Sequence, residues 1–99
     1  MNRDNALGEF LGARRALVSP EAVGLPADDG RRVPGLRREE VALLAGVSTD
    51  YYIRLEQGRE RHPSQQVLEA LAGALRLDED AARHLFRIVL PTPGTTEPI

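Results

Sequence analysis

The amino-acid sequence predicts an all-α fold built from five helices. Three observations lead to this prediction. Apolar residues recur at intervals of three and four along most of the chain, which is the spacing of an amphipathic helix. Serine, proline and glycine divide these stretches where helices would begin and end. No segment alternates apolar and polar residues in the way that a half-buried strand does.

The boundaries of the expected helices follow from capping residues and glycines. A serine or aspartate side chain accepts a hydrogen bond from the first turn of a helix, and a glycine after the last turn allows a left-handed cap. We expect, in chain order, a helix over 6–18, a brief turn opened by Ser19 and Pro20 and ended by Gly24, helices over 37–45 and 49–57, a helix capped by Ser64 and a helix capped by Asp78. Residues 19–36 then form a long insert between the first two main helices.

The composition favours one soluble domain without disulfides or a membrane span. A chain of 99 residues is long enough to enclose one core. It has no cysteine, which excludes disulfides and thiolate metal sites. No apolar run approaches the roughly 18 residues of a membrane helix, and no secretory signal begins the chain. We therefore expect a cytoplasmic protein.

Positive charge is concentrated in the middle third of the chain. The net charge is −2, and all 13 basic residues are arginines. Residues 31–62 carry seven arginines and five acids, a net charge of +2, whereas 1–30 and 63–99 each carry a net charge of −2. A negatively charged partner would meet this middle segment first.

The segment 38–57, REEVALLAGVSTDYYIRLEQ, has the spacing of a helix-turn-helix motif. Its first helix, with Val41, Leu44 and Ala45 on one face, ends at Gly46, and a second helix begins after three residues. Ala42 is small where two steeply crossed helices approach closely. The positions that would share a core are Val41, Ala45, Val47, Tyr52 and Leu55. The spacing alone also fits two core helices that meet at a tight turn in an unrelated bundle.

Two longer stretches carry a family resemblance. LRREEVALLAGVSTDYYIRLEQGR and PSQQVLEALAGALRLDEDAARHLF resemble the XRE family of phage-repressor-like helix-turn-helix regulators, and more narrowly its MmyB-like actinobacterial members. The resemblance implies a five-helix DNA-binding domain over residues 5–90, after a flexible start at 1–4. It also implies that residues 91–99 are a disordered tail or a linker to a C-terminal ligand-sensing domain that this chain lacks.

The front of the second motif helix holds the expected base contacts Thr49, Asp50, Tyr51 and Arg54. The arginine fork matches the O6 and N7 acceptors of guanine. Thr49 can meet a thymine methyl group or a phosphate, and Tyr51 a base or a phosphate. Asp50 can accept from cytosine N4 or merely stabilise the helix N-terminus. Tyr52 is expected in the core.

The expected phosphate contacts flank this helix. The family places such a contact at the start of the first motif helix, where Arg38 lies in this sequence. The full set of expected phosphate contacts is Arg37, Arg38, Ser48, Gln57, Arg59, Arg61 and Ser64, with Arg31 and Arg32 as an arm from the insert. For Arg31 and Arg32, as for Arg59 and Arg61, the alternative is a solvated loop without a binding role.

We also expect a structural ion pair between Arg14 and Glu56. Arg14 occupies a charged position in the apolar stripe of the first helix, which includes Leu17, and Glu56 follows core Tyr52 by one turn. Opposite charges that face one core are expected to pair, because either one alone is costly. The family resemblance places an ion pair at the same two positions.

The expected partner is double-stranded DNA, bound by a homodimer. The fifth-helix stripe Leu85, Phe86 and Val89, extended by Ile88 and Leu90, is expected to be a contact surface, either between subunits or with the missing C-terminal domain. Enzyme activity, a metal and a cofactor are not expected, because His62 and His84 lack ligand spacing and the acidic clusters lie at helix starts. The alternative function is a protein-interaction module that presents the basic 31–62 surface to an acidic partner.

Overall fold

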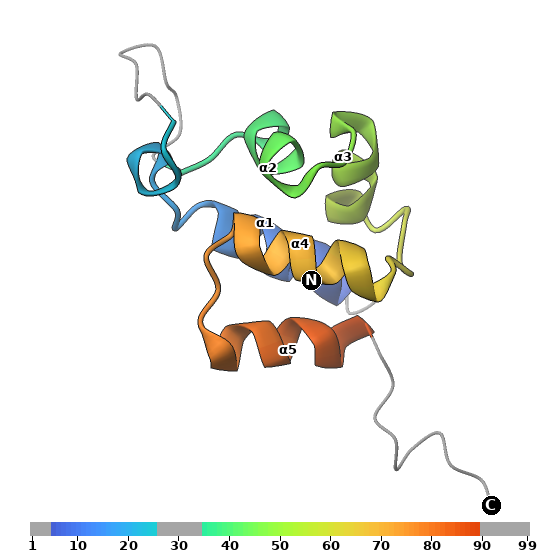
Figure 1. Cartoon of the computed structure of the whole chain (residues 1–99). Helices are drawn as coiled ribbons and strands as arrows, with labels where there is room; N and C mark the ends of the chain where they lie inside the picture. Colours follow the sequence, from blue (N-terminus) through green and yellow to red (C-terminus); the bar gives the residue numbers. More distant parts are fainter. Residues whose placement is uncertain (1–4, 26–34, 90–99) are drawn as a thin grey trace, which may run out of the picture.

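The computed structural model describes residues 5–25 and 35–89. Within these stretches the chain forms five α-helices, one short 3-10 helix and no strand (Figure 1). The elements are α1 (Ala6–Arg15), η2 (Pro20–Val23), α2 (Arg38–Ala45), α3 (Thr49–Gln57), α4 (Gln65–Ala74) and α5 (Glu79–Val89). This confirms the all-α prediction, including the five main helices and the long link between the first two. The expectations for 1–4, 26–34 and 90–99, Arg31, Arg32, Leu90 and the tail among them, lie outside the described residues.

The capping residues indicated by the sequence hold the helix starts. In four elements a side-chain oxygen accepts a hydrogen bond from the backbone N–H three residues later, at 2.8–3.3 Å. These cap residues are Ser19, Ser48, Ser64 and Asp78. Gly46, which follows α2, has a φ of 74°, a left-handed conformation that glycine adopts without steric cost. The predicted bounds of α2 and α3 and the predicted start of α4 are therefore confirmed to within one residue.

The helices pack around a single apolar core. In Figure 1, α1, α4 and α5 lie beneath α2 and α3. The central helix α2 contacts α3 and α4, while α1 contacts α3 and α5, and α4 contacts α5. The largest fully buried side chains are Tyr52, Leu11, Leu36, Leu55, Leu68, Leu71, Leu75, Leu85 and Val41. Burial of one such leucine contributes roughly 1.5–3 kcal/mol, so this core fixes α3 against the rest of the domain. No helix in the described ranges is long and apolar enough to cross a membrane.

Two expectations about inward-facing leucines are wrong. Helix α1 ends at Arg15 rather than at residue 18, and Leu17 beyond it is 72% exposed. Leu44 is 36% exposed, because the inner face of α2 is formed by Val41 and Ala42, which are 0% and 1% exposed. Both leucines lie toward the C-terminal ends of their segments and line hollows rather than the core.

Candidate nucleic-acid interface

Helices α2 and α3 form the predicted helix-turn-helix pair. The turn between them is closed by the N–H of Val47, which donates to the carbonyl of Ala42 at 3.0 Å. Tyr52 and Leu55 on the inner face of α3 are 0% exposed, which confirms their predicted core positions. The inner face of α3 is therefore sealed, and its opposite face is turned away from the protein.

The outer face of α3 presents four polar or amphipathic side chains. Thr49 and Asp50 are exposed at its start, and Tyr51 and Arg54 are half-buried. A guanidinium nitrogen of Arg54 lies 3.4 Å from an Asp50 carboxylate oxygen, and the guanidinium carbon is 5.8 Å from the centre of the Tyr51 ring. These contacts hold Arg54 against the helix, yet 40% of its side chain remains accessible. This face thus combines a hydroxyl, a carboxylate, a phenol and a guanidinium.

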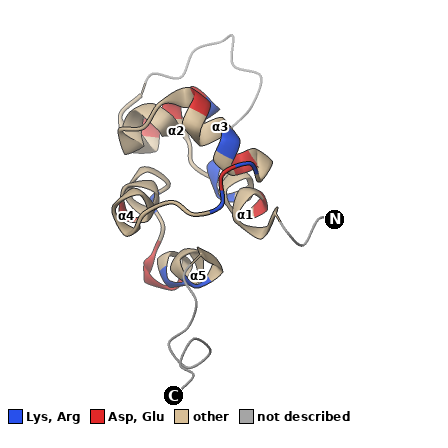
Figure 2. Cartoon of the chain, turned by 90° about the vertical axis from the view of Figure 1, so that its right-hand side faces the viewer, with Lys and Arg blue, Asp and Glu red and all other residues tan. Residues whose placement is uncertain are grey.

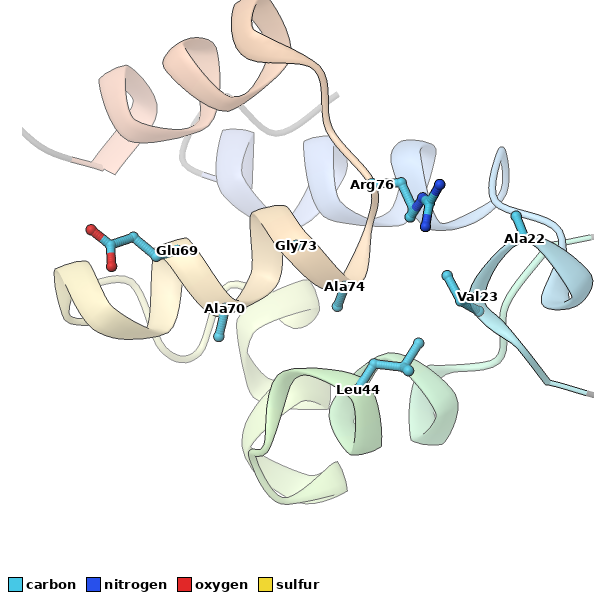
Figure 3. Close-up of a pocket in the computed structure, with 8 residues that line it drawn as sticks. All are labelled: Ala22, Val23, Leu44, Glu69, Ala70, Gly73, Ala74 and Arg76. Atoms are coloured by element: carbon cyan, nitrogen blue, oxygen red, sulfur yellow. The ribbon is translucent and has the colours of Figure 1, made fainter.

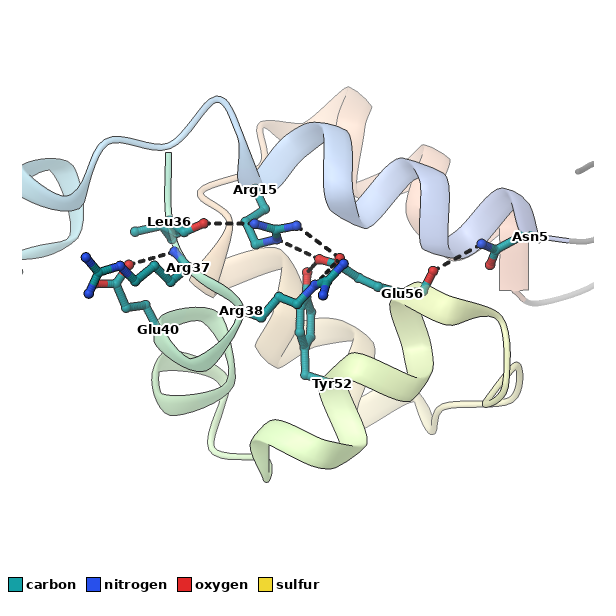
Figure 4. A network of polar contacts seen from close by, with 8 residues as sticks. All are labelled: Asn5, Arg15, Leu36, Arg37, Arg38, Glu40, Tyr52 and Glu56. Atoms are coloured by element: carbon teal, nitrogen blue, oxygen red, sulfur yellow. Dashed lines mark hydrogen bonds and ion pairs between the residues drawn. The ribbon is translucent and has the colours of Figure 1, made fainter. Parts of the chain in front are cut away.

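The inner end of α3 is held by a hydrogen-bond network around Glu56 (Figure 4). The carboxylate accepts from Nε of Arg15 at 2.7 Å and from Nη2 of Arg15 at 3.0 Å. It also accepts from Nε of Arg38 at 2.9 Å and from the hydroxyl of Tyr52 at 2.5 Å. A further nitrogen of Arg15 donates to the carbonyl of Leu36 at 3.0 Å. One carboxylate thereby connects α1, α2 and α3.

The network determines the ionisation of its members. Burial acts to raise the pKa of Glu56, but the hydrogen bonds from Arg15, Tyr52 and Arg38 outweigh it, and the net shift is downward. Burial, together with the neighbouring Glu56 carboxylate, raises the pKa of Tyr52 far above its ordinary value. At neutral pH the network therefore consists of a carboxylate, two guanidinium groups and a neutral phenol.

The partner of Glu56 in α1 is Arg15, and the prediction of Arg14 is wrong. Arg14 is adjacent on the helix and points elsewhere, and its Nε is buried without a hydrogen-bond partner. The rotation of α1 is set by Gly8, which lies on the same face of the helix as Arg15. A methyl group at Gly8 would overlap the backbone carbonyl of Glu56, so only a glycine allows this close approach. The side-chain amide of Asn5 donates to the same carbonyl at 3.1 Å. Close packing of the two backbones thus brings Arg15 to the carboxylate.

The comparisons with known proteins agree with this geometry. Residues 6–85 match the family model of the helix-turn-helix domain. The chain belongs to this family. No curated protein and no solved structure matches the chain. A helix-turn-helix domain implies DNA as the binding partner.

In this helix-turn-helix domain, most of the expected phosphate contacts that the structure describes lie just before or after α3 in the chain. Figure 2, a view from the α3 side, shows arginine segments on α3 and on the loop that follows it. The exposed members of the set are Arg38, Ser48, Gln57, Arg59, Arg61 and Ser64. Two of the arginines are held by the chain around them. Nη1 of Arg59 donates to the side chain of Gln57 at 3.2 Å, and Nε of Arg61 donates to the carbonyl of Gly58 at 3.1 Å.

The two arginines at the start of α2 have structural partners. Nε of Arg38 is bound to Glu56, while 47% of the Arg38 side chain remains exposed. The backbone N–H of Arg37 donates to the carboxylate of Glu40 at 2.7 Å, which fixes the beginning of the helix. The sequence indicated Arg38 only as a phosphate contact. Its bond to Glu56 was not predicted, because that contact depends on how α2 crosses α3.

The apolar stripe of α5 packs into the domain. Leu85 is fully buried, and Phe86, Ile88 and Val89 are half-buried against the core. The ring of Phe10 in α1 also contacts that of His84, at 5.3 Å between ring centres. The stripe therefore has less free surface than the sequence led us to expect. Exposed large apolar side chains lie elsewhere, at Leu17, Leu43 and Leu44.

Proposed function

We propose that this domain binds double-stranded DNA sequence-specifically, as part of a transcription regulator, with α3 in the major groove. The observation that carries the proposal is the outer face of α3. It is polar and accessible, whereas the opposite face is fixed by Tyr52, Leu55 and Glu56. A major groove about 12 Å wide admits one helix, and such a helix reads bases with the side chains near its N-terminus.

We assign base contacts to Thr49, Asp50, Tyr51 and Arg54, with Arg54 as the main reader. The fork of Arg54 suits the two acceptors of guanine, and the contacts with Asp50 and Tyr51 hold it on the outer face of α3. The ion pair with Arg54 also offsets the repulsion between the Asp50 carboxylate and the DNA backbone. Thr49 is placed to contact a thymine methyl group or a phosphate.

We assign phosphate contacts to residues that border α3 on both sides. Arg59 and Arg61 follow the helix, and Arg38 retains two outer nitrogens beyond its bond to Glu56. Ser48 and Ser64 mark the N-termini of α3 and α4, where backbone N–H groups favour anions. The proposed set also includes Arg37 and Gln57, with Arg31 and Arg32 as an arm of the insert.

The resemblance to the XRE family and its MmyB-like members extends this proposal to assembly. One reading helix covers few base pairs, so we propose that two copies pair on DNA, on half-sites about 10 base pairs apart centre to centre. Residues 5–90 are proposed to form the DNA-binding domain. A ligand-sensing domain, which is not part of this sequence, is proposed as its partner. Sedimentation without DNA should then show a monomer or a weak dimer, and a tight nanomolar dimer would contradict pairing on DNA.

The deciding experiment is selection of bound sequences from random DNA duplexes at near-physiological salt, followed by affinity measurements with Arg54→Ala and Arg59→Ala. Arg54→Ala should cost about 1–3 kcal/mol and relax the preference at one base pair per half-site. Arg59→Ala should weaken all sequences about equally and lower the salt slope by about 1. A uniform loss in both variants would remove Arg54 from base reading.

The same measurements separate DNA binding from the alternative function. A helix-turn-helix domain that contacts several phosphates should lose DNA affinity steeply as salt is raised. Absence of binding to any duplex, together with salt-tolerant binding of an acidic protein to the 31–62 surface, would instead favour an interaction module.

A further inference from the structure

Two hollows meet at the end of the molecule opposite α3. The larger one, about 370 Å³, lies between α4, η2 and α2 and is lined by Val23, Leu44 and Ala70 among others (Figure 3). The smaller one, about 240 Å³, lies between the end of α1 and the end of α4. They share Ala22 and Arg76. In Figure 1, η2 lies at the left end of the domain and α3 at the right end.

The smaller hollow combines positive charge with apolar surface. Arg14 and Arg76 line it together with Leu17, Val18 and Leu75, and none of the described residues that line it is acidic, whereas Glu69 lines the larger hollow. In the part of the chain that the structure describes, neither guanidinium has an ion-pair partner. The Nε of Arg14 is buried without a hydrogen bond, and Leu17 is 72% exposed. A group that satisfied both arginines and covered the leucine would have to be anionic and apolar.

Arg76 lies in the turn that caps α4, where its N–H donates to the carbonyl of Gly73 and the N–H of Leu77 donates to that of Ala72. It has a φ of 56° and is the one described non-glycine residue with positive φ. It follows α4 at the position where a left-handed glycine usually ends a helix. A side chain in this conformation costs stability. The Arg76 side chain lies between the end of α4 and η2 (Figure 3), and Arg76 lines both hollows.

We propose that this surface, defined by Arg14, Leu17, Val23, Leu44 and Arg76, docks an acidic segment of a partner protein that also carries a large apolar side chain. Carboxylates would pair with the two arginines, and charge-assisted hydrogen bonds of this kind are the stronger ones. The apolar side chain would enter a hollow beside Leu17 or Leu44.

The position of this surface determines what can occupy it. Its residues come from α1 and the turn after it, η2, α2 and the turn after α4, and none comes from α3. A partner bound here leaves the outer face of α3 open. A second copy of this chain is the less suitable occupant, because pairing through this end would place the two α3 helices at the far ends of the dimer. The rejection of a second copy rests on the proposed reading of DNA by α3, whereas the match to an acidic segment does not.

The test is selection of binders from a random peptide display library on the 99-residue protein, followed by affinity measurements on a synthetic consensus peptide. The consensus should contain Asp or Glu next to Leu, Ile or Phe. A version with amides in place of the carboxylates should bind about tenfold more weakly. Arg14→Gln and Arg76→Gly should each weaken the original peptide by a similar factor. The matched control is Arg87→Gln, an exposed arginine of α5 that should leave the affinity unchanged.

Arg76→Gly also guards against misfolding as an explanation, because glycine relieves the left-handed backbone and should raise the melting temperature. Loss of peptide binding in a more stable variant therefore reports the missing guanidinium. The proposal is overturned if no acidic consensus emerges, or if Arg76→Gly binds the peptide as wild type does. It is also overturned if a non-specific DNA duplex displaces the peptide, which would assign the surface to nucleic acid. A dimer in sedimentation that the peptide dissociates would overturn it as well, because it would assign the surface to a second copy of the chain.

Discussion

Replacement of Glu56 by alanine should destabilise the domain more than any exposed substitution. The Glu56 side chain is 5% exposed, and its carboxylate accepts four hydrogen bonds, from Arg15, Arg38 and Tyr52. Alanine removes the acceptor and leaves a largely buried guanidinium and a buried phenol without their partner. An unpaired buried charge is the costly outcome, whatever the net contribution of the intact pair.

The expected cost can be bounded from the exposure of each donor. Loss of one partner of a buried ion pair costs about 3–5 kcal/mol. Arg15 is 18% exposed and keeps its bond to the carbonyl of Leu36, and Arg38 is 47% exposed and can turn to water. Because both arginines keep another hydrogen-bond partner or reach water, the expected loss of unfolding free energy is near the lower end of this range, about 3 kcal/mol. A domain of this size is stable by roughly 5–15 kcal/mol, and 1 kcal/mol shifts its melting temperature by about 4–8 °C.

Urea unfolding followed by circular dichroism at the helix band measures this loss. The midpoint should fall without a change in the urea slope, since the same surface is exposed on unfolding. Glu69→Ala is the matched control, an exposed glutamate of α4 that should change stability by less than about 0.5 kcal/mol. If Glu56→Ala unfolds within 1 kcal/mol of wild type, the network is not the structural link described above.

Three further outcomes follow from the structure. Folding lowers the pKa of Glu56, so the stability that the carboxylate contributes is complete above its ordinary pKa of 4.5 and is lost as the pH falls through the folded pKa. The urea midpoints of wild type and Glu56→Gln should therefore converge in acid. Gly8→Ala should destabilise the domain by about 1–3 kcal/mol, because the added methyl group overlaps the carbonyl of Glu56. Gly73→Ala, which has open space around it on α4, should stabilise the domain by about 0.5–1 kcal/mol. Equal effects of the two substitutions would refute the close contact at Gly8. Arg76→Gly should raise the unfolding free energy by about 0.5–1 kcal/mol, and a decrease would show that its side chain supports the fold.

Most of the fold was predictable because it depends on local signals. Ser48, Ser64 and Asp78 determine where helices begin, and Gly46 determines where α2 ends, through hydrogen bonds or torsions that involve only neighbouring residues. The sequence also separated core Tyr52 from outward Tyr51, because one residue along a helix turns the side chain by about 100°.

The ion-pair partner was not predictable in the same way. Arg14 and Arg15 both lie near the apolar stripe of α1, and the rotation of the helix decides which one meets Glu56. That rotation is a long-range property, set by the contact of Gly8 with the backbone of α3. A signal was nevertheless present, since Gly8, Gly12 and Arg15 share one face of the helix. A methyl group built at Gly12 would lie 3.8 Å from Oε1 of Glu56, so small residues along that face marked the side of close approach.

Arg38 connects the stability of the domain to its proposed reading of DNA. Its Nε is committed to Glu56, whose other donors come from α1 and α3, and its outer nitrogens remain accessible at the start of α2. A phosphate bound by these nitrogens would be tied through a single side chain to the carboxylate that positions α3. The distance between a backbone contact and Asp50 and Arg54, the side chains proposed to read bases, is then fixed by the buried network rather than by a flexible surface residue. Arginine suits this role because its planar fork can serve a carboxylate and a phosphate together, whereas a lysine offers one point charge.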